Sequence, residues 1–260
     1  MKFFEKIKEI YTYRHMLKTL VKQDIRGKYK GSIFGFLWTL LNPLLLLAVY
    51  SIVFQFVFKL DIEHYPIYLF VALMPWTTFA NTIALGTNSV VANAAILKKV
   101  YFPREILPLA SVISNMINYI FSFVIIFIAL FIAGIGVSWY ILLLPILLVI
   151  QAIFTLAITL VLSAGNVYIR DIQYIMNPIM MIWMYATPIL YKVDMVPEKY
   201  MMLYKLNPMM HIIEGYRSIL YYKELPDFKW LGIIFGVSIV MLIIGFIIFE
   251  KLQRRFAEEV

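Results

Sequence analysis

The chain has 260 residues, of which 63% are hydrophobic and only 15% are charged, and its formal net charge is +8. A soluble domain usually carries about 45–50% apolar and about 25% charged residues, so this composition excludes a water-soluble fold and predicts an integral membrane protein. The absence of cysteine excludes disulfides, cysteine-ligated zinc and a thiol nucleophile.

Residues 1–30 form a basic and polar segment in which we expect no signal peptide. Apolar residues recur at helical spacing at Phe3, Ile7, Ile10, Leu17 and Val21, and lysines oppose them. This pattern predicts an amphipathic interface helix that lies on the inner leaflet. The helix is either an anchor on the lipid surface, which we favour, or a gate for a charged lipid headgroup.

Six uncharged apolar stretches in residues 31–260 are long enough, at about 20 residues, to cross a bilayer. They lack the alternation of polar and apolar residues that a membrane β-barrel shows, so helices are the remaining spanning structure. Gly134, Gly136 and Ser138-Trp139 divide the longest run in two. We predict one all-α transmembrane domain with spans at 33–58, 68–91, 106–133, 140–163, 174–191 and 231–249.

The distribution of charge predicts the orientation of these spans. Six spans place both termini on one side, together with the loops after the second and fourth spans. That side carries 16 Lys and Arg against 8 Asp and Glu, whereas the other side carries 7 of each kind. The positive-inside rule makes the basic side cytoplasmic. The excess charge therefore reflects topology and lipid contact, and we expect no nucleic-acid partner.

The predicted spans contain no Asp, Glu, Lys, Arg or His. Carriers driven by protons or ions usually bind the driving ion with such residues, so their absence argues against a secondary carrier. The chain also lacks the phosphate-binding motif G-x-x-x-x-G-K-[ST], so an energised function requires a second polypeptide. A membrane glycosyltransferase would need carboxylates or histidines at its active site, and no convincing set is present. We expect no catalytic residue, cofactor or metal in this chain.

Several motifs occur in an order that resembles one family. They are Asp24 to Trp38 followed by Asn42-Pro43, Met74-Pro75-Trp76 with Phe79, Asn93 to Pro108, Arg170-Asp171-Ile172, Thr187 to Tyr191, and Asn207-Pro208 with Tyr216-Arg217. From about residue 10 to its end, the chain resembles the permease subunits of bacterial polysaccharide ABC exporters. Permeases of the O-antigen (Wzm) type are most similar, and teichoic-acid and capsule exporter permeases are near relatives.

The resemblance implies a homodimer of this chain with two copies of a soluble ATPase subunit, which binds ATP and Mg²⁺. It implies export of a polyprenyl-diphosphate-linked polysaccharide across the bacterial inner membrane, with O-antigen as the expected glycan. Teichoic acid or capsular polysaccharide is the alternative substrate. A membrane-embedded glycosyltransferase and a passive channel are the alternatives from other classes.

Two predicted cytoplasmic loops are candidates for contact with the ATPase. In the loop 93–105, Tyr101 and Phe102 are expected to be exposed between charged residues, and Pro103 restricts the backbone. Such a loop suits docking into a groove, and the resemblance makes it the coupling helix; an ordinary basic loop is the alternative. The short loop at 170–171 either pairs internally or touches the same partner. The candidate contacts are Lys98, Lys99, Tyr101, Phe102, Pro103, Arg104, Glu105, Arg170 and Asp171.

Aromatic residues of the first and fifth spans are candidates for lining a translocation path. Aromatic faces contact sugar C–H surfaces without fixing one hydrogen-bond pattern, as a sliding polymer requires. Packing in the core or against lipid is the alternative. The candidates are Trp38, Tyr50, Phe54, Phe58, Trp183, Tyr185 and Tyr191.

Two further segments complete the expectations. The segment 192–229 is too polar to span and predicts short extracytoplasmic helices, which either re-enter the membrane as a gate or lie on its surface. On the cytoplasmic side, Arg26, Lys28 and Lys30 are candidates for attracting the lipid diphosphate through charge-assisted contacts. The positive-inside bias explains these three residues equally well.

Overall fold

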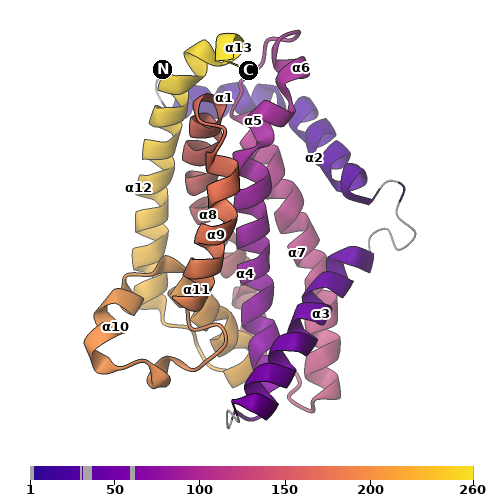
Figure 1. Ribbon diagram of the computed structural model, residues 1–260, viewed down its shortest axis with the longest axis vertical. Coiled ribbons are helices and arrows are strands. Elements are labelled where there is room, and N and C mark those ends of the chain that lie inside the picture. The colour runs from indigo at the N-terminus through magenta and orange to yellow at the C-terminus, as the bar shows by residue number, and fades with distance from the viewer. Residues whose placement is uncertain (1–2, 30, 32–36, 59–61, 260) are drawn as a thin grey trace.

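The computed structural model describes residues 3–29, 31, 37–58 and 62–259, and it contains helices and turns but no strand within these ranges (Figure 1). The α-helices are α1 (Phe3–Thr12), α2 (Arg14–Tyr29), α3 (Trp38–Ser51), α4 (Tyr65–Thr87), α5 (Ser89–Ala92), α6 (Ala94–Leu97), α7 (Ile106–Ile132), α8 (Leu144–Tyr168), α9 (Ile172–Tyr185), α10 (Glu198–Lys205), α11 (Pro208–Arg217), α12 (Phe228–Leu252) and α13 (Phe256–Glu259). The 3₁₀ segments are η3 (Trp139–Leu143), η4 (Val193–Met195) and η6 (Gln253–Arg255), and the π-helical segments are η2 (Ile52–Val57) and η5 (Ser218–Tyr222).

Four helices of the described residues are long and apolar enough to cross a bilayer. They cover Tyr65–Thr87, Ile106–Ile132, Trp139–Tyr168 and Phe228–Arg255. The second, third, fourth and sixth predicted spans are therefore confirmed as long apolar helices, and the all-α membrane fold is confirmed in outline. Figure 1 shows both chain termini at one end of this bundle, which we call the terminal end, and α10 and α11 toward the other, the distal end.

The first and fifth predicted spans form shorter helices. α3 continues into η2, so the described part of the first span is one helical run of about 30 Å, at about 1.5 Å per residue. Residues 33–36 of that span lie outside the described ranges. α9 has 14 residues and ends at Tyr185, so the predicted continuation of this helix to Tyr191 is wrong. Pro188 explains the difference, because it has no N–H to donate within a helix.

Local sequence signals explain where several helices begin and end. The side chain of Asp227 accepts hydrogen bonds from two backbone N–H groups in the first turn of α12, at 3.0 and 3.2 Å. Asn207 caps α11 in the same way, at 3.1 Å. These caps satisfy donors that have no partner within the helix. Gly134 and Gly136 adopt φ angles of +73° and +69°, which ends α7 and separates it from η3 as predicted.

The core lies around α8, which packs between α4 and α12. The larger group of buried apolar side chains joins α4, α7, α8, α9, α11 and the start of α12. A second group, at the terminal end, joins α2, the segment 97–107, the end of α8 and the end of α12. Gly245 permits the close approach of α12 to α8, since an added Cβ there would lie 2.9 Å from the carbonyl oxygen of Ala157.

The distal segment 192–229 combines an exposed helix with a buried one. α10 has no buried residue, whereas most of α11 is buried among α4, α8 and α12. Arg217, at the end of α11, is fully buried and pairs with Glu214 at 2.7 Å. It also donates to the carbonyl oxygens of Pro188 and Ile189, and its guanidinium lies 3.7 Å from the ring centroid of Tyr68. α11 is therefore held within the protein, and α10 is the surface part of the segment.

The close packing at Gly245 gives a stability prediction. Gly245→Leu forces α12 away from α8, and overpacking of this kind costs about 1–3 kcal/mol. Gly236→Leu is the matched control, because no atom lies within 4 Å of an added Cβ there. We expect a lower thermal unfolding midpoint in detergent for the first variant only. Equal midpoints for both variants would contradict the packing of α12 on α8.

Candidate functional site

The N-terminal helices pack against the protein at the terminal end of the bundle. α2 lies along α7 and buries Leu20 and Val21, while Ser114 of α7 donates a hydrogen bond to Asp24 of α2. Phe256 of α13 is fully buried in the same group of side chains. The apolar face that the sequence pattern assigned to the lipid surface is therefore partly occupied by contact with α7.

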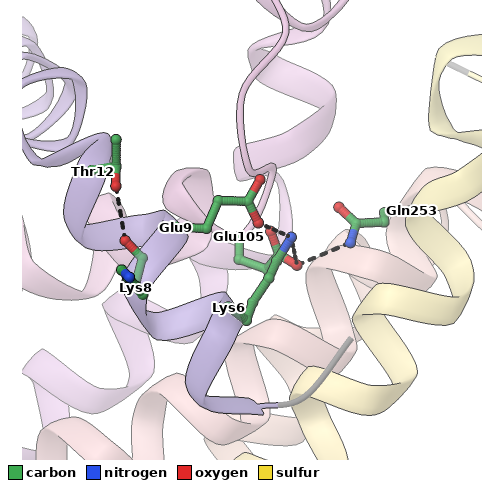
Figure 2. A network of polar contacts seen from close by, with 6 residues as sticks. All are labelled: Lys6, Lys8, Glu9, Thr12, Glu105 and Gln253. Carbon is green, nitrogen blue, oxygen red and sulfur yellow. Dashed lines mark hydrogen bonds and ion pairs between the residues drawn. The ribbon is translucent and has the colours of Figure 1, made fainter.

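A buried ion pair joins α1 to the residue before α7 (Figure 2). Glu105 is 1% exposed, and its Oε1 lies 3.2 Å from Nζ of Lys6. The same oxygen accepts a hydrogen bond from Nε2 of Gln253 at 2.9 Å, and Lys6 also contacts Glu9 at 3.1 Å. Figure 2 shows the Lys6 amine between the two carboxylates, so α1, α7 and the C-terminal segment meet at one point.

The charge on Lys6 is stabilised by this arrangement. Burial lowers the pKa of Lys6, but the carboxylates of Glu105 and Glu9 outweigh burial, so the pKa is raised overall. A raised lysine pKa contributes stability that is fully present below its ordinary value of about 10.4 and is lost only as the pH rises through the raised value. Lys6 is therefore charged at neutral pH.

The loop between α6 and α7 presents only part of the predicted docking set on its surface. Lys98, Lys99 and Tyr101 are exposed, and the Tyr101 side chain is 83% exposed. A hollow of about 240 Å³ lies among these residues and Arg104. Arg104 is half-buried and donates a hydrogen bond to the backbone carbonyl of Gln253, which fixes it to the C-terminal segment.

Three predicted contact residues of this loop are buried. Phe102 is 4% exposed, so the prediction that its ring is exposed beside Tyr101 is wrong. Phe102 belongs to the buried group at the terminal end, Pro103 is buried next to it, and Glu105 is turned inward to Lys6. The exposed tip of the loop is therefore the run 98–101.

The remaining predicted contacts with the partner and with the lipid lie outside this loop. Arg170 and Asp171 are exposed in the turn between α8 and α9, which Figure 1 places at the terminal end. Arg26 is exposed on α2. The side chain of Lys28 and the whole of Lys30 lie outside the described part of the chain.

A polar face of α7 was not singled out by the sequence analysis. Ser111, Asn115, Asn118 and Ser122 recur at intervals of four, three and four residues, which places them on one side of the helix. All four are at most 7% exposed. This spacing is visible in the sequence and could have identified the face, since uncharged polar residues rarely align so regularly along a spanning helix by lipid contact alone.

Two cavities follow this face of α7 and form one polar cleft. The larger, of about 710 Å³, lies between α2, α4, α7 and α9 near the terminal end and includes Asn88 and Asn93. The smaller, of about 300 Å³, lies between α3, α4 and α7 and includes Asn81 and Asn118. Leu85 lines both, so the cavities adjoin. Polar side chains in such a position indicate a space for water or a ligand.

The predicted path residues of α3 and η2 follow one another along the helix. The rings of Tyr50 and Phe54 are 6.5 Å apart between centroids, and those of Phe54 and Phe58 are 5.2 Å apart. Trp38, one end of the same predicted row, lines the smaller cavity instead. The first predicted span thus contributes one aromatic residue to the polar cleft.

The predicted path residues of the fifth span have other surroundings. Trp183 packs against the rings of Phe79 and Phe154, and its Nε1 donates to a side-chain oxygen of Asn207 at 3.0 Å. The hydroxyl of Tyr191 lies 2.8 Å from the carbonyl oxygen of Tyr185, to which it donates. These contacts support the packing alternative for Trp183. Tyr50 and Phe54 of the first row border the same buried apolar group as Trp183 and Tyr191 of the second, and a common path lining stays a prediction.

Arg217 is a second residue whose burial was not predicted. The sequence analysis counted it among the charges of the distal loop, yet its side chain is 0% exposed. The sequence feature that could have indicated this burial is the position of Arg217 within residues 208–221, most of which are apolar. A fully buried arginine needs partners for its charge, and Glu214 with two backbone carbonyls supplies them for the two terminal nitrogens here.

Comparison of the sequence with known protein families identifies the family of this chain. The sequence profile of the family described as "ABC-2 type transporter" matches residues 15–221. The chain belongs to the ABC-2 type transporter family. With its long apolar helices, this ABC-2 chain is a multi-pass membrane protein of the permease class. Among the described residues of this transporter chain, no group of three or more metal-ligating side chains is present.

Near full-length relatives share about a third of their residues with this ABC-2 chain. An O-antigen export system permease protein RfbA of Myxococcus xanthus is 35% identical over 256 residues, covering 98% of each chain. Two proteins of the same description from Klebsiella pneumoniae are 34% and 32% identical over 245 residues, covering 94% of each chain. The alignment therefore includes both the loop 93–105 and the polar cleft.

The ion pair at the terminal end of this ABC-2 chain gives a second prediction. Lys6→Ala leaves Glu105 charged and buried with only Gln253 as a partner, and breaking such a pair costs about 3 kcal/mol. The double variant Lys6→Ala with Glu105→Gln removes the unpaired charge and should recover most of the loss. Lys8→Ala, on the exposed side of α1, is the control. Thermal unfolding in detergent measures all three, and a double variant no more stable than Lys6→Ala would refute the pairing.

Proposed function

We propose that this chain is the transmembrane subunit of an ABC exporter that moves O-antigen, attached to a polyprenyl-diphosphate lipid, from the cytoplasm to the periplasm. The observation that carries the proposal is the identity of 32–35% with O-antigen export permeases over at least 94% of each chain. The chain has no phosphate-binding loop for ATP, so a separate nucleotide-binding subunit hydrolyses ATP with Mg²⁺.

The proposed topology has six crossings of the bacterial inner membrane with both termini in the cytoplasm. The four long helices supply four crossings, and α3 with η2 and α9 with the turn after it supply the other two. The terminal end is cytoplasmic because the side that contains both termini carries 16 of the 23 basic residues. Two copies of this chain and two ATPase subunits form the exporter.

The ATPase docks at the exposed tip 98–101 in this proposal. Tyr101 is the most exposed aromatic residue of the loop, and Lys98 and Lys99 give the tip a positive charge. Buried residues on both sides of the tip hold it in place, as a docking element requires. Arg170 and Asp171, exposed at the same end, extend this contact.

The lipid diphosphate meets the exporter at the basic end of α2. Arg26 is exposed there, and Lys28 and Lys30 follow it in the sequence. Guanidinium and ammonium groups favour phosphate oxygens through charge-assisted hydrogen bonds. Gly27, which directly follows Arg26 in the sequence, helps to line the larger cavity, and this supports the assignment.

Removal of the chain from its host tests the proposed function. Without the permease, lipid-linked O-antigen should accumulate on the cytoplasmic face of the inner membrane, and surface O-antigen should be lost. Extraction of lipid-linked glycan and staining of surface polysaccharide measure the two quantities. Surface O-antigen at the normal level in the deletion strain would contradict the proposal.

Substitution of the tip tests the docking of the ATPase. Tyr101→Ala should weaken co-purification of the ATPase subunit by about tenfold or more, because aromatic anchors dominate protein interfaces. Tyr11→Ala is the matched control, since Tyr11 is a 68% exposed tyrosine on α1. Both variants should keep the thermal stability of the parent protein. Unchanged association of Tyr101→Ala, or equal loss in both variants, would rule out the tip as the docking site.

A further inference from the structure

The smaller cavity of the polar cleft has a neutral, amide-rich lining. Asn42 of α3, Asn81 of α4, and Asn115 and Asn118 of α7 contribute to it. Within the described chain, no Lys, Arg, His, Asp or Glu side chain lines this cavity of about 300 Å³. Trp38, the first residue of α3, also lines the cavity. The chemistry of the cavity is therefore hydrogen bonding without charge.

Asn118 provides the main evidence that this cavity holds a ligand. Its side chain is 6% exposed, and its Oδ1 has no hydrogen-bond partner among the described residues. Nearly all buried polar atoms in folded proteins have a partner, so such an atom requires an explanation. Asn118 lies near the middle of the 27-residue α7, where lipid supplies no donor. The cavity that Asn118 lines offers space for the missing donor.

The hydroxyl groups of the lining complement this amide. Thr77 and Thr78 both donate to the carbonyl of Met74, at 3.1 and 2.9 Å, and Ser122 donates to the carbonyl of Asn118 at 3.1 Å. A hydroxyl whose proton is used within its own helix keeps lone pairs that accept from a ligand. The lining thus offers both acceptors and amide donors, which suits a ligand that is rich in hydroxyl groups.

We propose that this cavity is a binding site for sugar units of the exported polysaccharide, held through their hydroxyl groups; the inference rests on the proposed function. A sugar hydroxyl both donates and accepts, as does an asparagine side chain, so the two match in either direction. The lipid diphosphate is a poor fit, because the cavity has no cation to neutralise it. The volume lies at the lower end of the range of about 300–1,000 Å³ for small-molecule sites, which suits about one or two sugar units.

The adjoining larger cavity makes the site part of a route. Its asparagines, Asn88 and Asn93, lie nearer the terminal end, and Leu85 lines both cavities. A hydroxyl-bearing chain that moves along the cleft exchanges one set of polar partners for the next. Asp24 is the one charged residue among the described lining of the larger cavity, and it already accepts a hydrogen bond from Ser114. The other polar contacts along the cleft are neutral and therefore weaker than charge-assisted ones.

Export by variant complexes tests the site. Asn118→Leu removes the unpaired acceptor and nearly conserves volume, so export of lipid-linked glycan should slow by about tenfold or more. Thr78→Val and Thr82→Val are a matched pair, since both hydroxyls donate to the carbonyl four residues earlier but only Thr78 lines the cavity. Export should slow in Thr78→Val and stay normal in Thr82→Val. Co-purification with the ATPase confirms that each variant is folded. Normal export by Asn118→Leu, or equal slowing in the two threonine variants, overturns the inference.

Chemical labelling of the cavity gives a readout that is independent of the export rate. The chain has no native cysteine, so Asn81→Cys supplies a single thiol at the cavity. A water-soluble maleimide should label it more slowly in cells that make the glycan than in cells whose glycan synthesis is blocked. Tyr11→Cys, on the exposed side of α1, should label equally in both. Equal labelling of Asn81→Cys in both kinds of cell, or no labelling at all, overturns the inference and leaves the proposed function intact. A wild-type complex that exports no glycan would instead refute the proposed function.

Discussion

The loss of water around buried polar groups is the constraint on which the rest of this structure depends. A bundle this apolar has few polar side chains, and an unpaired one is expensive in hydrocarbon. Arg217 is paired with a carboxylate and two carbonyls, Gln151 accepts from Tyr216 and donates to the carbonyl of Pro75, and Glu105 is paired with a lysine. These pairs fix helices to one another. Among the described residues, three of the buried polar atoms that lack a partner belong to Ser89, Asn118 and Tyr119, which line the cleft.

The terminal end couples an exposed tip to the membrane helices without a loose connection. The tip at 98–101 is followed at once by the buried Phe102 and Pro103, and Glu105 directly precedes α7. In the proposed exporter, a displacement of the tip by a docked ATPase would reach α7 through packed residues, and it would reach α1 through the ion pair with Lys6. The polar face of the cleft lies on α7, so the helix that follows the proposed docking tip also carries the proposed sugar site.

The sequence predicted the helices better than it predicted the surroundings of single residues. Long uncharged runs and the glycines after α7 located four spans, because the bilayer requires length and apolarity that composition records directly. The end of α9 was placed too late, since apolarity continues past Pro188 although the helix does not. The burial of Phe102 was missed because neighbouring aromatic residues at a loop give no sign of which one packs inward. The role of Asn118 was not predicted, because a neutral amide does not interrupt an uncharged run and its burial depends on which helices pack around it.

The central claim is that ATP hydrolysis by a separate subunit drives the movement of a lipid-linked glycan through this permease. Reconstitution of the chain with its ATPase tests this claim most directly. The measurement is the appearance of glycan on the far face of vesicles that contain lipid-linked polysaccharide on the near face. The account predicts that translocation requires this chain, the ATPase and hydrolysable ATP together. Translocation by this chain alone, at the same rate with or without ATP, would contradict it.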